Sequence, residues 1–133
     1  MVDVFFGGGR KVNARIKGFT VLTDQGIQSG GEGSAPEPFT LFLASLATCA
    51  GVYVQSFCQQ RDISTEEITL KMYWDWDAVN KMIASIQIDI NVPADFPEKY
   101  DNAVINAASL CAVKRHMKES IGSEIRIIRT KLN

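Results

Sequence analysis

The sequence lacks an excess of charge of either sign, and this absence argues against one broad class of function. Its 14 lysine and arginine residues are balanced by 15 aspartate and glutamate residues, which gives a net charge of −1. Proteins that bind nucleic acid usually carry a basic patch, because the phosphate backbone attracts clustered cations. The densest basic cluster here, Lys114-Arg115-His116 with Lys118, is short. We therefore expect no nucleic-acid partner.

Cysteine and histidine are also scarce, with three cysteines and one histidine in the chain. Cys49, Cys58 and Cys111 form neither an even-numbered disulfide framework nor a CxxC metal pattern. A metal site made of Cys49, Cys111 and His116 would have no standard spacing and no evident fourth ligand. We expect no metal and no other cofactor. No signal peptide is recognised, and together with the cysteine pattern this favours a reducing, cytoplasmic location.

Charge is absent altogether between Glu37 and Arg61, and the segment 38–60 is long enough to cross a membrane. Several polar side chains interrupt it, however, and its N-terminal flank is acidic and glycine-rich, without a basic anchor. We interpret the segment as a long core helix, buried on nearly all sides, and expect no membrane partner.

Alternating apolar and polar residues predict strands on both sides of this helix. Short strands at 1–6, 12–17 and 19–22 form an antiparallel meander before it. After it, a strand within 63–76 and another over 86–92 form a hairpin with one buried face.

The hairpin carries Trp74 and Trp76 on one face, which we interpret as packing in the core or in a dimer. No basic groove accompanies them, as a stacking platform for nucleotides would require. A two-stranded hairpin cannot shield an apolar helix from all sides. We therefore expect a homodimer in which the two long helices pack against each other's sheets.

A second helix is predicted from the capping-box spacing and first-turn proline of Asp95–Glu98. Its apolar residues recur at helical spacing and end at Cys111, which therefore faces inward. A shorter helix at 113–120 and a strand at 124–132 follow. The whole chain, residues 1–133, is thus a single α+β domain.

The positions of the cysteines limit how they can pair. Cys49 and Cys58 lie nine residues apart on one helix, about 13.5 Å along its axis, which is too far for a disulfide. Cys111 is the one cysteine free to meet Cys49, and the two form a candidate dithiol. On pattern alone, both are more often small core residues. A reactive thiol needs a nearby cation or dipole, and the candidate cations are Arg10, Arg15, Lys114 and Arg115.

Two segments carry a family resemblance: GGEGSAPEPFTLFLASLATCAGVYV at 30–54 and AVINAASLCAVKRH at 103–116. Together they resemble the OsmC/Ohr family of osmotically inducible and organic hydroperoxide resistance proteins, and most closely its small OsmC-like branch. The resemblance extends over essentially the whole chain. It implies an OsmC-like α+β fold with antiparallel sheets around a long central helix, formed by an intertwined homodimer with sites at the subunit interface.

The resemblance also implies a thiol-dependent peroxidase that reduces organic or hydrogen peroxides in oxidative-stress defence, without metal or flavin. By motif position, Cys49 matches the peroxidatic cysteine and Cys111 the resolving cysteine. Arg10, which follows a glycine pair, matches the arginine that stabilises the thiolate and polarises the peroxide. A dithiol reductant, of the lipoyl type found with Ohr relatives, would restore the pair.

The chain departs from the family pattern at one place. Members usually carry an acidic residue at the start of the long helix, where it pairs with the arginine. Here Phe39 or Thr40 occupies that place, while Glu37 and Glu32 lie nearby but out of register. The departure favours an alternative, a dimeric small-molecule-binding or scaffold protein with the same fold and little peroxidase activity.

Overall fold

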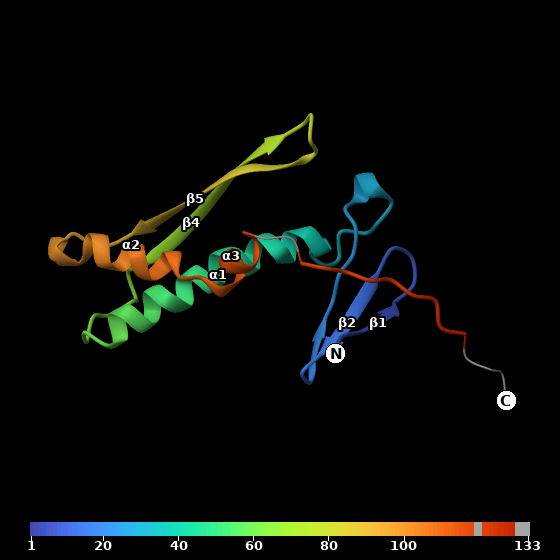
Figure 1. Cartoon of the computed structure of the whole chain (residues 1–133), viewed down its shortest axis with the longest axis horizontal. Coiled ribbons are helices and arrows are strands. Elements are labelled where there is room, and N and C mark those ends of the chain that lie inside the picture. Colours follow the sequence, from blue (N-terminus) through green and yellow to red (C-terminus); the bar gives the residue numbers. More distant parts are fainter. Residues whose placement is uncertain (119–120, 130–133) are drawn as a thin grey trace.

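The computed structural model describes residues 1–118 and 121–129 (Figure 1). It contains five strands: β1 (Asp3–Phe6), β2 (Val12–Ile16), β3 (Phe19–Val21), β4 (Thr69–Asp77) and β5 (Met82–Asn91). It contains three α-helices, α1 (Pro38–Gln59), α2 (Asp101–Ser109) and α3 (Ala112–His116), and two short 3-10 turns, η1 (Ile27–Ser29) and η2 (Glu98–Tyr100). The predicted α+β class and the order of elements as far as α3 are confirmed.

The strand predicted at 124–132 is not found where it can be checked. Residues 121–129 form neither helix nor strand, and 130–132 lie outside the described residues. In Figure 1 this segment runs away from the helices as an extended chain. A strand needs a neighbouring strand to pair with its backbone groups, and no described strand of the same chain pairs with this segment.

The first three strands form an antiparallel sheet in the order β1-β2-β3. The turn between β1 and β2 is closed by the amide of Gly7, which donates to the carbonyl of Lys11 (2.9 Å). Gly8 and Gly9 in this turn have φ angles of 87° and 56°, which glycine adopts without steric cost. Much of the apolar surface of the sheet stays exposed, notably Phe6 and Phe19.

The glycine-rich connection before α1 is built around the buried carboxylate of Asp24. This carboxylate accepts hydrogen bonds from the hydroxyl of Ser34 (2.6 Å) and from the backbone amides of Ser34, Gln25 and Glu32. The Ser34 hydroxyl is the largest of the causes that lower the pKa of Asp24 to about 2. A side chain at Gly31 would lie 2.0 Å from the carbonyl oxygen of Gln25, so only glycine fits there. The loop is therefore a folded connection.

Helix α1 starts at Pro38, where the predicted long helix begins. Ser34 does not cap it, because its hydroxyl is bound to Asp24. Glu37 is the N-cap residue without a side-chain cap, and its carboxylate instead accepts a hydrogen bond from the amide of Gly26 (2.9 Å). The fixed φ of a proline in the first turn suits this position.

Within one chain, α1 is buried along one stripe and not on nearly all sides as expected. Phe39 and Val52 on other faces are 48% and 57% exposed. The helix has 22 residues and a mean hydropathy of 1.6, which would suffice to cross a membrane, and 33% of its most apolar window is buried. A core helix can meet the same criteria. The buried residues are Leu43, Leu46, Ala50, Val54, Phe57 and Cys58.

The core lies at the C-terminal half of α1, where α2 and the base of the hairpin meet it (Figure 1). Val54, Phe57 and Cys58 pack there against Phe96 and Val104. Burying a large apolar side chain contributes about 1.5–3 kcal/mol. This cluster therefore fixes α2 against α1 and sets where the chain after α2 begins.

Strands β4 and β5 pair antiparallel, with an irregularity between Asp75 and Trp76. The hairpin tip projects away from the helices (Figure 1). Trp74 and Trp76 on this outer half are 48% and 55% exposed, so the expectation of one buried face holds only near the base. Within a single chain the two tryptophans are not core residues, because none of the helices found in the described residues covers this part of the hairpin.

Candidate functional site

Cys49 lies half-buried in the middle of α1, where α3 crosses the helix. The backbone amide of Val113 is the largest of the causes that lower the pKa of the Cys49 thiol, followed by the neighbouring Cys111 thiol. The amide of Ala112 and the positive charge of Arg115 lower the pKa further, against the opposing effect of partial burial. Hydrogen bonds and cations near a thiol favour its thiolate, which is the nucleophilic form.

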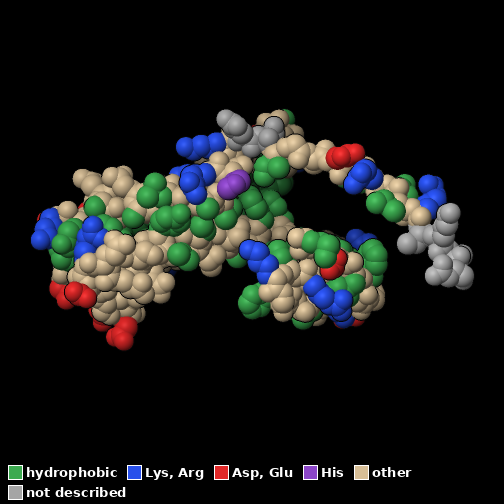
Figure 2. All heavy atoms as spheres, turned by 60° about the horizontal axis from the view of Figure 1, so that its bottom comes forward, with side chains coloured by type: hydrophobic (Ala, Val, Ile, Leu, Met, Phe, Trp, Pro, Cys, Tyr) green, Lys and Arg blue, Asp and Glu red, His purple; other side chains and the backbone are tan. Residues whose placement is uncertain are grey.

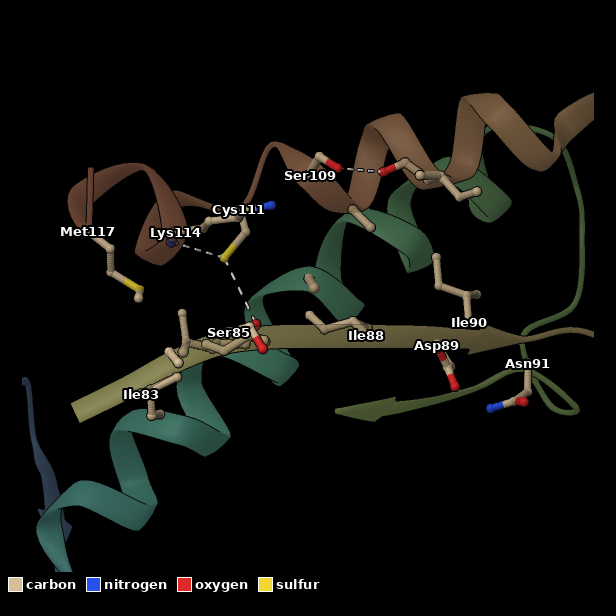
Figure 3. Close-up of a pocket in the computed structure, with 16 residues that line it drawn as sticks. Ile83, Ser85, Ile88, Asp89, Ile90, Asn91, Ser109, Cys111, Lys114 and Met117 are labelled. Carbon is tan, nitrogen blue, oxygen red and sulfur yellow. Dashed lines mark hydrogen bonds between the residues drawn. The ribbon is translucent and has the colours of Figure 1, made fainter. Parts of the chain in front are cut away.

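Cys111 does not lie on the helix to which the sequence assigned it. Helix α2 ends at Ser109, and Cys111 follows in the bend before α3, where it is the N-cap residue. Its thiol donates to the carbonyl oxygen of Leu46 (3.9 Å), and its sulfur accepts a hydrogen bond from the amide of Lys114 (3.5 Å), as the dashed lines in Figure 3 show. The expected inward orientation is found, since the residue is only 2% exposed.

The structure thus brings two free thiols, Cys49 and Cys111, to the same place from α1 and from the α2–α3 bend. Cys58, nine residues further along α1, is fully buried in the core, as predicted. Burial raises the pKa of its thiol, and the charge of Arg61 opposes this only in part. Such an environment disfavours the thiolate.

Arg10 lies exposed in the turn between β1 and β2. The cation that acts on Cys49 within one chain is Arg115, which the sequence offers only as one of four candidates. Within the described residues, neither glutamate near the start of α1 forms an ion pair with Arg10: Glu37 binds the amide of Gly26, and Glu32 forms its salt bridge with Lys11. The acid missing near Thr40 is therefore not replaced inside a single chain.

A groove of about 840 Å³ lies between α1, β5 and the α2–α3 segment, and Cys111 is the cysteine that lines it (Figure 3). Leu46 and Ala50 of α1 lie on one side, isoleucines of β5 on another, and Cys111, Lys114 and Met117 complete it. Its size and its largely apolar lining are typical of sites that take small organic ligands.

The surface near the site carries cations but no evident metal site. His116, the purple side chain in Figure 2, is exposed, and its ring Nδ1 lies 2.7 Å from the carbonyl oxygen of Ala112. Lysine or arginine side chains lie next to it on one side in the same view. No group of three or more potential metal ligands occurs among residues 1–118 and 121–129.

Sequence reasoning missed the amide donors of Ala112 and Val113. No glycine or proline marks the end of α2, so the pattern continued that helix through Cys111 and gave no signal for the bend. Asp24 was missed as well. The only available signal was an aspartate at the edge of a glycine- and serine-rich loop, a residue type that often binds nearby backbone amides.

The arrangement of a meander, a long central helix and a hairpin with a second cysteine-bearing segment defines an α+β class that solved structures share. A protein of Psychrobacter arcticus 273-4 with a suggested role in osmotic stress and detoxification has a TM-score of 0.73 and 21% identity, over 86% of this chain and 85% of that one. An OsmC-like protein of Mycoplasma pneumoniae has a TM-score of 0.70 and 11% identity, over 89% and 86%.

An OsmC-like hydroperoxide resistance protein of Jannaschia sp. CCS1 has a TM-score of 0.56 and 22% identity, over 96% of this chain and 90% of that one. The family model for OsmC-like proteins matches residues 31–126, which include both cysteines of the site. The chain belongs to the OsmC-like protein family, as its sequence motifs suggested. No curated protein sequence matches it.

Proposed function

We propose that the protein is a thiol-dependent peroxidase that reduces organic or hydrogen peroxides in oxidative-stress defence. The observation that supports this most directly is the pair of free thiols, in which the pKa of Cys49 is lowered and Cys111 lies beside it. A low-pKa thiol next to a second thiol is what a cysteine-based peroxide reductant requires. Two structural relatives named for hydroperoxide resistance, from Legionella pneumophila and Jannaschia, support the same class.

The reaction would proceed in two steps at these two sulfurs. The Cys49 thiolate attacks the terminal oxygen of the hydroperoxide, the O–O bond breaks, and the alcohol leaves with a proton, which produces a sulfenic acid. The Cys111 sulfur then attacks the Cys49 sulfur, water leaves, and a disulfide forms. A resolving thiol at contact distance protects the sulfenic acid from irreversible oxidation.

The groove supports a preference for peroxides with an organic tail. Its apolar lining along β5 and α1 would bury such a tail beside Cys111, the cysteine that lines the groove. A dithiol reductant of the lipoyl type, acting in the cytoplasm by thiol–disulfide exchange, would return both cysteines to the reduced form.

We further propose that the working unit is an intertwined homodimer. Much apolar surface stays exposed in one chain, including Phe6, Trp76 and the extended segment with Ile125 and Ile127. Apolar surface on this scale is typical of a protein interface. A partner chain would cover it, and would also give Arg10 a route to the Cys49 of the other subunit. Light scattering coupled to size exclusion should therefore give twice the mass of one chain.

The peroxidase proposal is tested by following the consumption of cumene hydroperoxide with a dithiol reductant. We expect turnover by the wild type and by Cys58→Ala, none above the uncatalysed rate for Cys49→Ser, and a single turnover without a disulfide for Cys111→Ser. If the wild type and Cys49→Ser consume peroxide equally, the proposal is wrong.

Arg10 forms no ion pair with a residue of 1–118 or 121–129, and this supports a second candidate, a dimeric small-molecule-binding or scaffold protein with little peroxidase activity. Under this alternative the groove would still bind an apolar ligand. An apolar fluorescent probe that binds wild type and Cys49→Ser equally, combined with absent turnover, would favour this second function.

A further inference from the structure

Cys111 has a structural role that oxidation of its thiol would disturb. Its sulfur is the N-cap of α3, accepting the amide of Lys114, and its S–H is donated to the carbonyl of Leu46 on α1. The sulfur therefore links α3 to α1 in the reduced protein, as Figure 3 shows. Any reaction at this sulfur changes both hydrogen bonds at once.

Helix α3 depends on such a link because it is very short. It has five residues, Ala112–His116, whereas an isolated helix of that length is unstable in water. None of its residues is fully buried. Its position against α1 therefore depends on partly buried side chains and on the hydrogen bonds of Cys111, which supplies the cap.

We propose that α3 is a redox-sensitive latch: the Cys111 thiol caps it beside the groove in the reduced protein, and formation of the Cys49–Cys111 disulfide uncaps it, so that α3 frays while Cys111 stays tethered to α1. The proposal rests on the proposed function in that it uses the same thiol pair. A disulfide needs its sulfurs about 2.05 Å apart, so the Cys111 sulfur must leave its cap position. The S–H donor to Leu46 is lost outright.

The peroxide itself is the two-electron oxidant for disulfide formation. Two thiols and one hydroperoxide become one disulfide, one alcohol and one water: the S–S bond forms, the O–O bond breaks, and the two thiol protons end on the alcohol and the water. A diazene oxidant such as diamide performs the same two-electron oxidation of the thiols and is itself reduced to a hydrazine. The latch can therefore be opened without any peroxidase activity.

Opening would change the groove where a reductant must enter. Lys114 and Met117, which follow Cys111 on and after α3, form part of the groove wall. When α3 frays, the side chains of that wall move and the disulfide becomes accessible. The reduced protein thus presents a groove bounded by an ordered α3, and the oxidised protein presents a groove open on that side to a dithiol reductant.

Hydrogen–deuterium exchange on the full chain tests the latch. We compare the amides of Ala112–His116 in the reduced protein and after diamide treatment, with disulfide formation confirmed by intact mass. Loss of an N-cap should accelerate exchange of these amides by roughly fivefold. The amides of α2, Asp101–Ser109, should not change and serve as the folding control.

Three matched variants isolate the cap. Cys111→Ser keeps an acceptor for the Lys114 amide but cannot form the disulfide, so α3 should stay protected with or without diamide. Cys111→Ala should exchange rapidly even when reduced. Cys49→Ser keeps the Cys111 cap and should not respond to diamide.

The outcomes separate this proposal from the peroxidase. If the disulfide forms but α3 keeps its slow exchange, the latch is wrong, whatever the turnover. If diamide opens α3 while cumene hydroperoxide is not consumed, the latch stands and the peroxidase proposal fails. If no intrachain disulfide forms with either oxidant, both proposals fail.

Discussion

The middle and the C-terminal end of α1 carry the same chemical group in opposite environments. Cys49 faces the amides of Ala112 and Val113 and the charge of Arg115, which lower the pKa of its thiol. Cys58 lies among apolar side chains with no exposed surface, and burial raises the pKa of its thiol. Cys49 lies in the middle of α1, and Cys58 lies one residue before its end. The difference comes from what packs against each: a capped bend with free amide donors or an apolar cluster.

The largest effect of this difference should be in reactivity. We expect a single-cysteine variant that keeps Cys49 to be alkylated by iodoacetamide at neutral pH at least about tenfold faster than one that keeps Cys58, because thiolate and access are both needed. Intact mass against time measures the rates. Equal alkylation rates, with both variants shown to be folded by circular dichroism, would contradict the proposed difference between the two sites.

The second effect should be on stability, where substitution of Cys58 should have a larger effect than substitution of Cys49. Cys58→Ser places a hydroxyl in an apolar cluster and should lower the free energy of unfolding by about 1–3 kcal/mol. Cys49→Ser should cost less than about 0.5 kcal/mol, because the site is half-buried and its amide donors can bind the hydroxyl. Urea unfolding at neutral pH measures both. A larger loss at Cys49 would contradict the proposed environments.

A smaller effect should come from removing the positive charge of Arg115. Arg115→Gln should raise the pKa of Cys49 and slow its alkylation at neutral pH, whereas Lys118→Gln, another exposed cation of the same segment, should change little. The pH dependence of the alkylation rate measures the shift. A larger effect of Arg10→Gln than of Arg115→Gln would show that a partner chain supplies the dominant guanidinium.

The smallest effect should appear only in acid, at the loop before α1. Asp24 has its pKa lowered from 3.8 to about 2, so the unfolded chain binds more protons in this interval. Its stabilising effect is fully present above about 3.8 and is lost as the pH falls toward about 2. Asp24→Asn should abolish this dependence, and exposed Asp95→Asn should keep it, in thermal unfolding followed across acid pH. An unchanged profile in Asp24→Asn would contradict the role of this carboxylate.

Much of the fold could be predicted because it depends on local pattern. The alternation of apolar and polar residues predicted the positions of β1 to β5 to within a few residues, and the long uncharged run predicted the position of α1. The errors arose where the structure depends on contacts between segments that are distant in the sequence. The exposed faces of α1 and the tip of the hairpin lack covering elements in the chain, and the segment 121–129 has no strand to pair with.

The sequence predicted which residues form the site better than it predicted how they are arranged. The family motifs selected Cys49 and Cys111, and the structure brings these two thiols together. The motifs could not show that Cys111 is a cap outside α2, because capping depends on where the helix ends. Nor could they show which cation acts within one chain.

The sequence by itself determined that Cys49 and Cys58 share one apolar helix at a spacing that forbids their pairing. It also determined that Cys111 belongs to a second inward-facing segment. Only the tertiary structure decided which of the two helix cysteines is the acidic one. The reason is physical: a thiol's pKa depends on the donors, charges and burial around its sulfur, and at Cys49 these come from residues some sixty positions away in the chain.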